Sequence, residues 1–233
     1  MPSFCSPIPA WLRPALVLLV ACSNNADAPG PDAAPSCDPA TVLPSNYRPI
    51  AAISAGAVAV TTTAAVTSGT IDATAGGMAA AADNPYIYVD LKAGTKVDVS
   101  DLAARTSTAW DIALKRQSIR LNSGDSGSGN RELAIVQAAT LAEVTAAPTS
   151  GYATDDFTTA DCMFDALPAG DPNTVFGQWY AYDDMTHMPT PKPEVYVIKR
   201  ADGSRTVFRI ATYYGDPQMS RGAFYGVEWK QLP

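Results

Sequence analysis

The chain has 233 residues, of which 47% are hydrophobic and 17% are charged, and its formal net charge is −7. This composition is typical of a globular protein and excludes both a disordered chain and one that crosses a membrane repeatedly. No run of Lys or Arg is longer than two residues, so the sequence lacks the basic stripe typical of nucleic-acid binding. The single histidine, His187, excludes metal sites that need several imidazoles from one chain.

Residues 1–21 predict a lipoprotein signal peptide. The apolar run from Ala15 to Ala21 is long enough for the hydrophobic part of a signal peptide but too short to span a bilayer. It ends at Leu19-Val20-Ala21-Cys22, which resembles a lipobox, where the cysteine becomes the lipidated first residue of the mature protein. Ser23 stands where an aspartate would favour the inner membrane of many bacteria. We therefore expect a protein held by lipid alone on the outer membrane, on its periplasmic or its cell-surface face.

Residues 22–45 predict a lipidated flexible tether, because their many Pro, Ala and Asp residues cannot bury enough apolar surface to fold. This expected processing determines which cysteines remain in the folded domain. Cys5 leaves with the signal peptide and Cys22 carries lipid, so Cys37 and Cys162 remain. In an oxidising envelope two such thiols predict one disulfide, and two unpaired thiols are the alternative.

Residues 46–233 predict a single, mainly β domain of several packed antiparallel sheets. Alternating apolar and polar residues predict strands in the segments 53–74, 86–91, 96–99, 111–121, 195–200, 206–210 and 224–229. The dipeptide Asp202-Gly203 predicts a hairpin turn between two of them. Two stretches, 76–82 and 139–147, favour short helices, and the Gly- and Ser-rich segment 122–130 predicts a mobile loop.

The sequence contains one segment that copies a catalytic motif. Gly124-Asp125-Ser126-Gly127 matches the nucleophile segment of trypsin-like proteases, in which a histidine earlier in the chain activates the serine. Here no histidine precedes the serine. The acidic pairs Asp155-Asp156 and Asp183-Asp184 are more typical of solvated turns than of catalytic carboxylates. No nucleophile and base can be paired, so we expect the protein not to be an enzyme.

Residues 179–189 have the most unusual chemistry of the sequence. Met185, His187 and Met188 lie within four positions of one another, after the aromatic residues of the Trp179-Tyr180-Ala181-Tyr182 segment. The prolines that follow exclude a regular central strand, so the segment predicts a stiff loop with soft ligands at its tip. The alternative is that the two methionines fill a gap in the core while His187 faces water.

A series of segments occurs in a consistent order over residues 84–229. They are Trp110-Asp111-Ile112-Ala113, Ile119-Arg120-Leu121-Asn122-Ser123-Gly124, the Trp179–Tyr182 segment, the Met-Thr-His loop, Val195-Tyr196-Val197-Ile198, the Asp202-Gly203 turn and Tyr213-Tyr214. In this order they resemble the HmuY family of haem-binding lipoproteins. The resemblance implies an all-β, surface-exposed lipoprotein that captures haem b in the bacterial envelope. It also implies transfer of the haem to an outer-membrane transporter of the TonB-dependent kind.

The resemblance further implies two axial ligands on the iron, which are two histidines in some members of the family and two methionines in others. With one histidine available, the ligands implied here are Met163 with Met185 or Met188, or a mixed pair that includes His187. Such thioether ligands would make haem capture stronger on reduction and tolerant of mild acid. A flat apolar haem also needs aromatic walls, for which the candidates are Tyr180, Tyr182, Phe164 and Phe176.

Two other hypotheses compete with haem capture. The Met-Thr-His-Met cluster has soft donors that suit Cu(I), which would make the chain a copper-binding envelope protein. A surface interaction module without a ligand is the third hypothesis, and in that case none of these donor side chains has a function.

Overall fold

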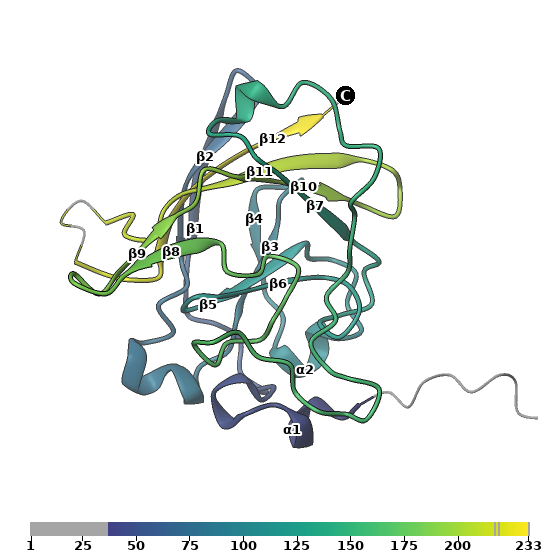
Figure 1. The fold of residues 1–233 in the computed structure, drawn as a ribbon, viewed down its shortest axis with the longest axis vertical. Helices are drawn as coiled ribbons and strands as arrows, with labels where there is room; N and C mark the ends of the chain where they lie inside the picture. The colour runs from purple at the N-terminus through teal and green to yellow at the C-terminus, as the bar shows by residue number, and fades with distance from the viewer. Residues whose placement is uncertain (1–36, 217, 219, 233) are drawn as a thin grey trace, which may run out of the picture. The chain divides into compact units, whose positions relative to one another are not determined.

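Three antiparallel sheets make up most of the structure, a computed structural model that describes residues 37–216, 218 and 220–232 (Figure 1). The six-stranded sheet has the order β1 (Val58–Thr63), β2 (Val66–Asp72), β12 (Phe224–Leu232), β11 (Arg205–Thr212), β10 (Val195–Lys199) and β7 (Glu132–Val136). The four-stranded sheet has the order β4 (Thr95–Val97), β3 (Ile87–Asp90), β5 (Ile112–Lys115) and β6 (Ser118–Leu121). A two-stranded ribbon consists of β8 (Tyr180–Asp183) and β9 (Met188–Pro191). The predicted mainly β class is confirmed.

Helical segments are short. They are α1 (Pro39–Val42), α2 (Asp101–Ala104) and the 3₁₀ turns η1 (Ser45–Tyr47), η2 (Met78–Asp83) and η3 (Leu141–Glu143). The helices expected over 76–82 and 139–147 are present only as η2 and η3, because segments this short gain too few hydrogen bonds to offset the cost of starting an α-helix. Among the described residues, no helix has the length and apolar character needed to cross a membrane.

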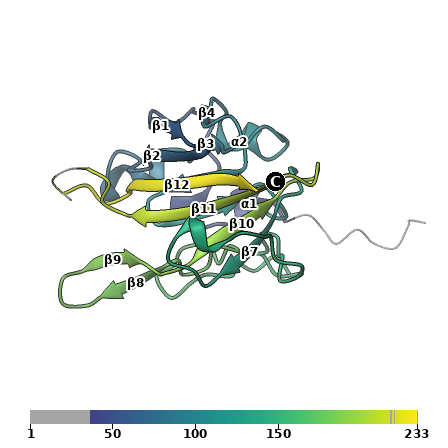
Figure 2. The ribbon, with the colours of Figure 1, turned by 90° about the horizontal axis from the view of Figure 1, so that it is seen from above.

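The main core lies between the six-stranded and the four-stranded sheets (Figure 2). It contains side chains of both, among them Ile112, Leu114, Ile119, Tyr196, Phe208 and Trp229. A second cluster covers the outer face of the six-stranded sheet with residues around η3, and a third covers the outer face of the four-stranded sheet with α2 and Trp110. Strands β5 and β10 are therefore buried on both faces, which explains their nearly continuous apolar sequences.

Residues 37–45, which the sequence analysis assigned to the flexible tether, are folded. Asp38 caps α1 by accepting a hydrogen bond from Ala40 N at 3.0 Å, and Leu43 is buried. A disulfide joins Cys37 to Cys162, the pair expected from the sequence. The composition of residues 37–45 does not predict this folding, because the contacts that hold the segment, such as the disulfide to Cys162, are made with residues far away in the chain. The expected signal peptide 1–21 and residues 22–36, with Cys22, lie outside the described residues.

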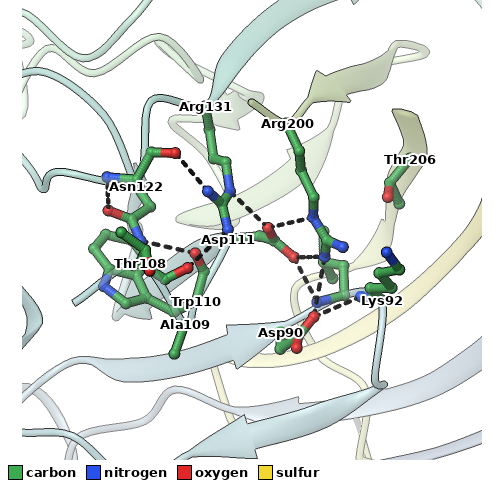
Figure 3. A network of polar contacts seen from close by, with 12 residues as sticks. Asp90, Lys92, Thr108, Ala109, Trp110, Asp111, Asn122, Arg131, Arg200 and Thr206 are labelled. Atoms are coloured by element: carbon green, nitrogen blue, oxygen red, sulfur yellow. Dashed lines mark hydrogen bonds and ion pairs between the residues drawn. The ribbon is translucent and has the colours of Figure 1, made fainter. Parts of the chain in front are cut away.

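A buried ion-pair network connects the two large sheets (Figure 3). Asp111, whose side chain is 1% exposed, accepts hydrogen bonds from Leu91 N at 2.8 Å and from Nε of Arg131 and Arg200 at 3.0 and 2.8 Å. Arg200 also contacts Asp90 at 3.0 Å. The two arginines flank strands of the six-stranded sheet, and the two aspartates belong to the four-stranded side. The network therefore fixes the position of one sheet on the other.

The segment 122–130 is a hydrogen-bonded turn with Asn122, Ser123 and Ser126 buried, and not the mobile loop expected from its Gly and Ser content. The buried Asn122 amide donates to the carbonyl oxygens of Ser107 and Trp110 at 2.9 and 2.8 Å and accepts from Gly129 N at 2.9 Å. A Cβ atom on Gly129 would lie 2.5 Å from the Asn122 side chain. Glycine is required here because the backbone passes close to a buried amide.

Candidate functional site

The candidate ligands stand on the β8–β9 hairpin. Its two strands pair antiparallel, with Tyr180 opposite Pro191 and Asp183 opposite Met188. The Asp183 carboxylate accepts hydrogen bonds from Met185 N at 2.8 Å and from Thr186 N at 3.2 Å, which closes the turn. Proline is tolerated in β9 because this strand has a partner on one side only. The stiff loop expected from the prolines is thus a two-stranded hairpin outside the large sheets.

The hairpin turn presents its soft donors to solvent. Met185 is 90% exposed, and His187 is exposed and adopts the left-handed conformation at φ 57°. The Tyr182 hydroxyl lies 3.1 Å from His187 Nδ1 and orients the imidazole. Met188 is half-buried. Met185 therefore fills no gap in the core, and its thioether is free to contact a ligand.

An aromatic cluster forms the base of the hairpin. The Trp179 ring centroid lies 4.9 Å from that of Tyr180, 5.7 Å from Tyr213 and 5.4 Å from Tyr225. Tyr213 packs edge-on against Tyr214 at 5.1 Å. These residues belong to the hairpin, to the segment after β11 and to β12. The hairpin and the connection between β11 and β12 thus share one rigid base and lie at the same end of the sheets (Figures 1 and 2).

Tyr214 of this cluster and Tyr182 of the hairpin are accessible to solvent. Tyr182 is 48% exposed and Tyr214 is half-buried. Burial raises the pKa of Tyr214, the charge of Arg116 opposes this increase and Tyr182 adds to it, so both groups lie near the Tyr214 hydroxyl. Burial also raises the pKa of Tyr180, with further contributions from Asp171 and Tyr182. Tyr180 and Tyr214 therefore stay uncharged at neutral pH.

Met163 lies elsewhere in the structure. It is 65% exposed in a tight turn where Thr159 N donates to the Met163 carbonyl oxygen at 2.8 Å. The neighbouring Cys162 is bonded to Cys37 at the start of the described chain, which lies across the fold from the β8–β9 hairpin in Figure 1. The structure does not bring Met163 together with the hairpin donors.

The two candidate phenylalanines also lie away from the exposed tyrosines. Phe164 is half-buried beside Met163. Phe176 is buried in the main core, with its ring centroid 4.9 Å from that of Tyr196. Of the aromatic walls expected from the sequence, only Tyr180 and Tyr182 lie on the hairpin. Within the described residues, no three His, Cys, Asp or Glu side chains form a group that could bind a metal ion.

The connection between β11 and β12 was missed as part of the site by the sequence analysis. It starts with Tyr213 and Tyr214 and continues with Asp216, whose carboxylate accepts hydrogen bonds from Ser220 N at 3.1 Å and Arg221 N at 2.9 Å. By sequence it also contains Met219, which lies outside the described residues. The available signal was a methionine in a polar segment that follows two adjacent tyrosines.

Comparison with known proteins identifies the family. The family model described as HmuY protein matches residues 82–224, more than half of the chain. The chain belongs to the HmuY family. The match spans β3 to the start of β12, so the hairpin, the β11–β12 connection and all of the aromatic cluster except Tyr225 lie in the HmuY-family region. Cys37, β1 and β2 precede it. No curated protein matches the chain.

Solved structures share the HmuY-family fold. An apo HmuY analogue of Tannerella forsythia is 20% identical, with a TM-score of 0.50, over 71% of this chain and 95% of that one. A candidate lipoprotein of Bacteroides fragilis is 16% identical, with a TM-score of 0.51, over 75% and 94%. A structure described as a candidate HmuY-like haem-binding protein of Bacteroides vulgatus is 21% identical, with a TM-score of 0.48, over 75% and 96%. At these identities the first two similarities concern the fold.

The protease-like segment has a structural role in this HmuY-family chain. Ser126 is buried, and its hydroxyl donates to Asp155 at 2.6 Å. The same carboxylate accepts hydrogen bonds from Leu121 N at 2.8 Å and Val175 N at 3.0 Å. His187, the single histidine, is on the β8–β9 hairpin. Ser126 therefore helps to anchor a buried aspartate between three segments and has no base to activate it.

Proposed function

We propose that this HmuY-family chain binds haem between the β8–β9 hairpin and the β11–β12 connection. One observation carries the proposal. The Met185 thioether and the His187 imidazole stand exposed on a hairpin whose base is an aromatic cluster shared with the β11–β12 connection. Family membership and the ordered segments of the sequence give further support.

The available residues fit the chemistry of haem. Haem is a flat apolar disc with an iron that takes axial ligands, so it needs aromatic contacts and donors above and below its plane. Tyr182 and Tyr214 offer aromatic contact surface. Met185, His187 and Met188 are the donors on the hairpin. When bound through thioethers, the iron favours its ferrous state.

The second axial ligand is assigned to the β11–β12 connection. This connection shares the aromatic base with the hairpin and includes Met219 by sequence. Met163, the ligand implied by the family resemblance, stands next to the disulfide and across the fold from the hairpin. M163A is therefore the matched control, since it removes an exposed thioether from outside the proposed site.

Haemin titration tests the proposal. We expect a shift of the Soret absorption band on binding, and tighter binding after reduction with dithionite. Among M185A, H187A, M188A and M219A, removal of a true axial ligand should weaken binding at least as much as the roughly 10- to 100-fold typical of losing an outer-shell partner. M163A should bind like the parent.

Absence of a Soret shift with both oxidised and reduced protein would overturn the proposal. Retention of Cu(I) in equilibrium dialysis without haem uptake would assign the hairpin to copper instead. Four variants with unchanged haem spectra, despite haem binding by the parent, would move the haem site away from the hairpin and the β11–β12 connection.

We further propose that the chain is lipidated at Cys22 and passes its haem to a transporter of the outer membrane. The lipobox-like sequence before Cys22 supports the anchor. The parent should fractionate with membranes, and the Cys22→Ser variant should be released into the soluble fraction because it lacks the acylation site. Membrane association of the variant equal to that of the parent would contradict lipid anchoring at this residue.

A further inference from the structure

A cleft lined by cations lies beside the β11–β12 connection. Its volume is about 470 Å³, and Arg116, Arg221, Met78 and Gly222 are among the residues that line it. It shares Arg116 and Met78 with a smaller cleft of about 100 Å³ that extends to Lys115. The described residues that line the two clefts include no Asp or Glu. In a chain of net charge −7, such a surface attracts anions selectively.

Arg116 is held with an unused donor. It occupies the first position of the two-residue turn between β5 and β6, with φ 53°, where glycine is usually preferred. Its Nη1 donates to the Gly222 carbonyl oxygen at 3.1 Å, which fixes the guanidinium against the β11–β12 connection. Its Nε is buried and has no hydrogen-bond partner among the described residues. A non-glycine residue in this conformation is uncommon.

Lys115 is the second cation with an unused donor. The residue is 1% exposed, and its Nζ has no hydrogen-bond partner in the described part of the chain. Burial lowers the pKa of Lys115 to about 8. A buried ammonium group without an acceptor is unfavourable, and an anion in the smaller cleft would provide the acceptor.

Arg221 provides a second, exposed charge in the lining of the larger cleft. Its side chain is 52% exposed, packs over the Phe224 ring at 4.8 Å and contacts Asp72 at 3.2 Å. An exposed ion pair of this kind contributes little to stability and exchanges readily for another anion. Arg131 and Arg200, in contrast, are paired with the buried Asp111.

The cleft borders the proposed haem site. Burial raises the pKa of Tyr213, and the charge of Arg116 opposes the increase, as it does at Tyr214. The Arg116 carbonyl oxygen also accepts a hydrogen bond from the Tyr225 hydroxyl at 2.6 Å. Gly222 lies so close to the aromatic cluster that a Cβ atom there would be 2.9 Å from the Tyr213 ring. Arg116 and Gly222 therefore separate the cleft from the aromatic surface.

We propose that Arg116 and Arg221 bind the propionate carboxylates of the haem held at the β8–β9 hairpin, an inference that rests on the proposed function. Guanidinium groups pair with carboxylates through two parallel hydrogen bonds, which orients the haem as well as holding it. Lys115 reinforces the positive potential from the inner end of the cleft. The apolar part of the disc then faces Tyr182 and Tyr214, and its charged edge faces the cations.

Comparing the binding of haemin with that of an esterified haem tests the role of the propionates separately from haem binding itself. Haemin dimethyl ester has the same ring and iron but no carboxylate charge. The parent should bind haemin about 10- to 100-fold more tightly than the ester, and the double variant R116Q/R221Q should bind both equally weakly. R105Q removes an exposed arginine outside the cleft and should keep the preference of the parent. Thermal unfolding of each variant checks that the fold is retained.

An undiminished preference for haemin over its ester in R116Q/R221Q would overturn the propionate assignment while the haem proposal stands. Absence of a Soret shift with haemin in the parent would instead overturn the proposed function. Calorimetry with succinate tests whether the cleft binds a free dicarboxylate instead of the haem propionates. Succinate binding to the haem-free parent that disappears in the double variant would assign the cleft to free dicarboxylates and also overturn the propionate assignment.

Discussion

Replacement of Asp111 by Ala is expected to lower the free energy of unfolding by about 3–5 kcal/mol, because it removes the shared carboxylate partner of two buried guanidinium groups and leaves Arg200 with Asp90 alone. The side chains of Arg131 and Arg200 are 11% and 9% exposed, so water cannot replace the lost partner fully. Leu91 N also loses its acceptor. Urea unfolding of the D111A variant, followed by tryptophan fluorescence, measures the effect.

Asp98→Asn is the matched control. Asp98 pairs with Lys96 at 3.0 Å, but its side chain is 73% exposed. Exposed pairs of this kind contribute about 0–1 kcal/mol. If D111A and D98N were destabilised equally, the network at Asp111 would not be what fixes one sheet on the other.

The stability of the protein is expected to fall between about pH 4 and pH 6 because of Asp155. Burial raises the pKa of this carboxyl from 3.8 to about 6, although the hydrogen bonds from Ser126, Val175 and Leu121 lower it. In this window the folded state therefore binds more protons than the unfolded state, and the free energy of unfolding decreases as pH rises. The shift corresponds to about 3 kcal/mol, all of it lost above pH 6.

The Asp155→Asn variant tests this expectation because its side chain does not titrate. Between pH 4 and pH 7, the free energy of unfolding of the parent should fall by about 3 kcal/mol more than that of D155N. Other buried acids with raised pKa values, Asp101 and Asp171, contribute equally to both proteins. Asp156 is exposed, so D156N should follow the parent. Identical pH dependence in D155N and the parent would contradict the assignment.

Local patterns were sufficient to predict two of the hairpins. The Asp202-Gly203 turn predicted the pairing of β10 with β11, the segment 86–91 contains β3, and the segment 96–99 overlaps β4. These pairs are formed by residues close in sequence, so turn residues and alternation determine them. Strand β7 was missed, because it pairs with β10 and the partner lies far along the chain.

The candidate site was predictable only in part. The soft donors of the hairpin could be found because Met185, His187 and Met188 are adjacent in sequence. The contact between the hairpin and the β11–β12 connection could not be found from the sequence, because Trp179 contacts Tyr213 and Tyr225 only in the folded chain. The structure places Met163 next to the disulfide and not beside the hairpin, a position that could not be inferred because sequence order carries no information on which turns meet.

By itself, the sequence determined the mainly β class, two of the hairpins and the cluster of soft donors, because composition and neighbouring residues decide each of these. The cysteine pair was reached by elimination, since Cys5 and Cys22 fall in the expected signal peptide and lipidation site. Only the tertiary structure decided that residues 37–45 fold, that the Gly- and Ser-rich segment 122–130 is held around the buried Asn122, and that Arg116 and Arg221 share a cleft. Those features depend on contacts between residues far apart in the chain. Local preferences cannot predict such contacts, because burial and charge pairing depend on the complete arrangement of the sheets.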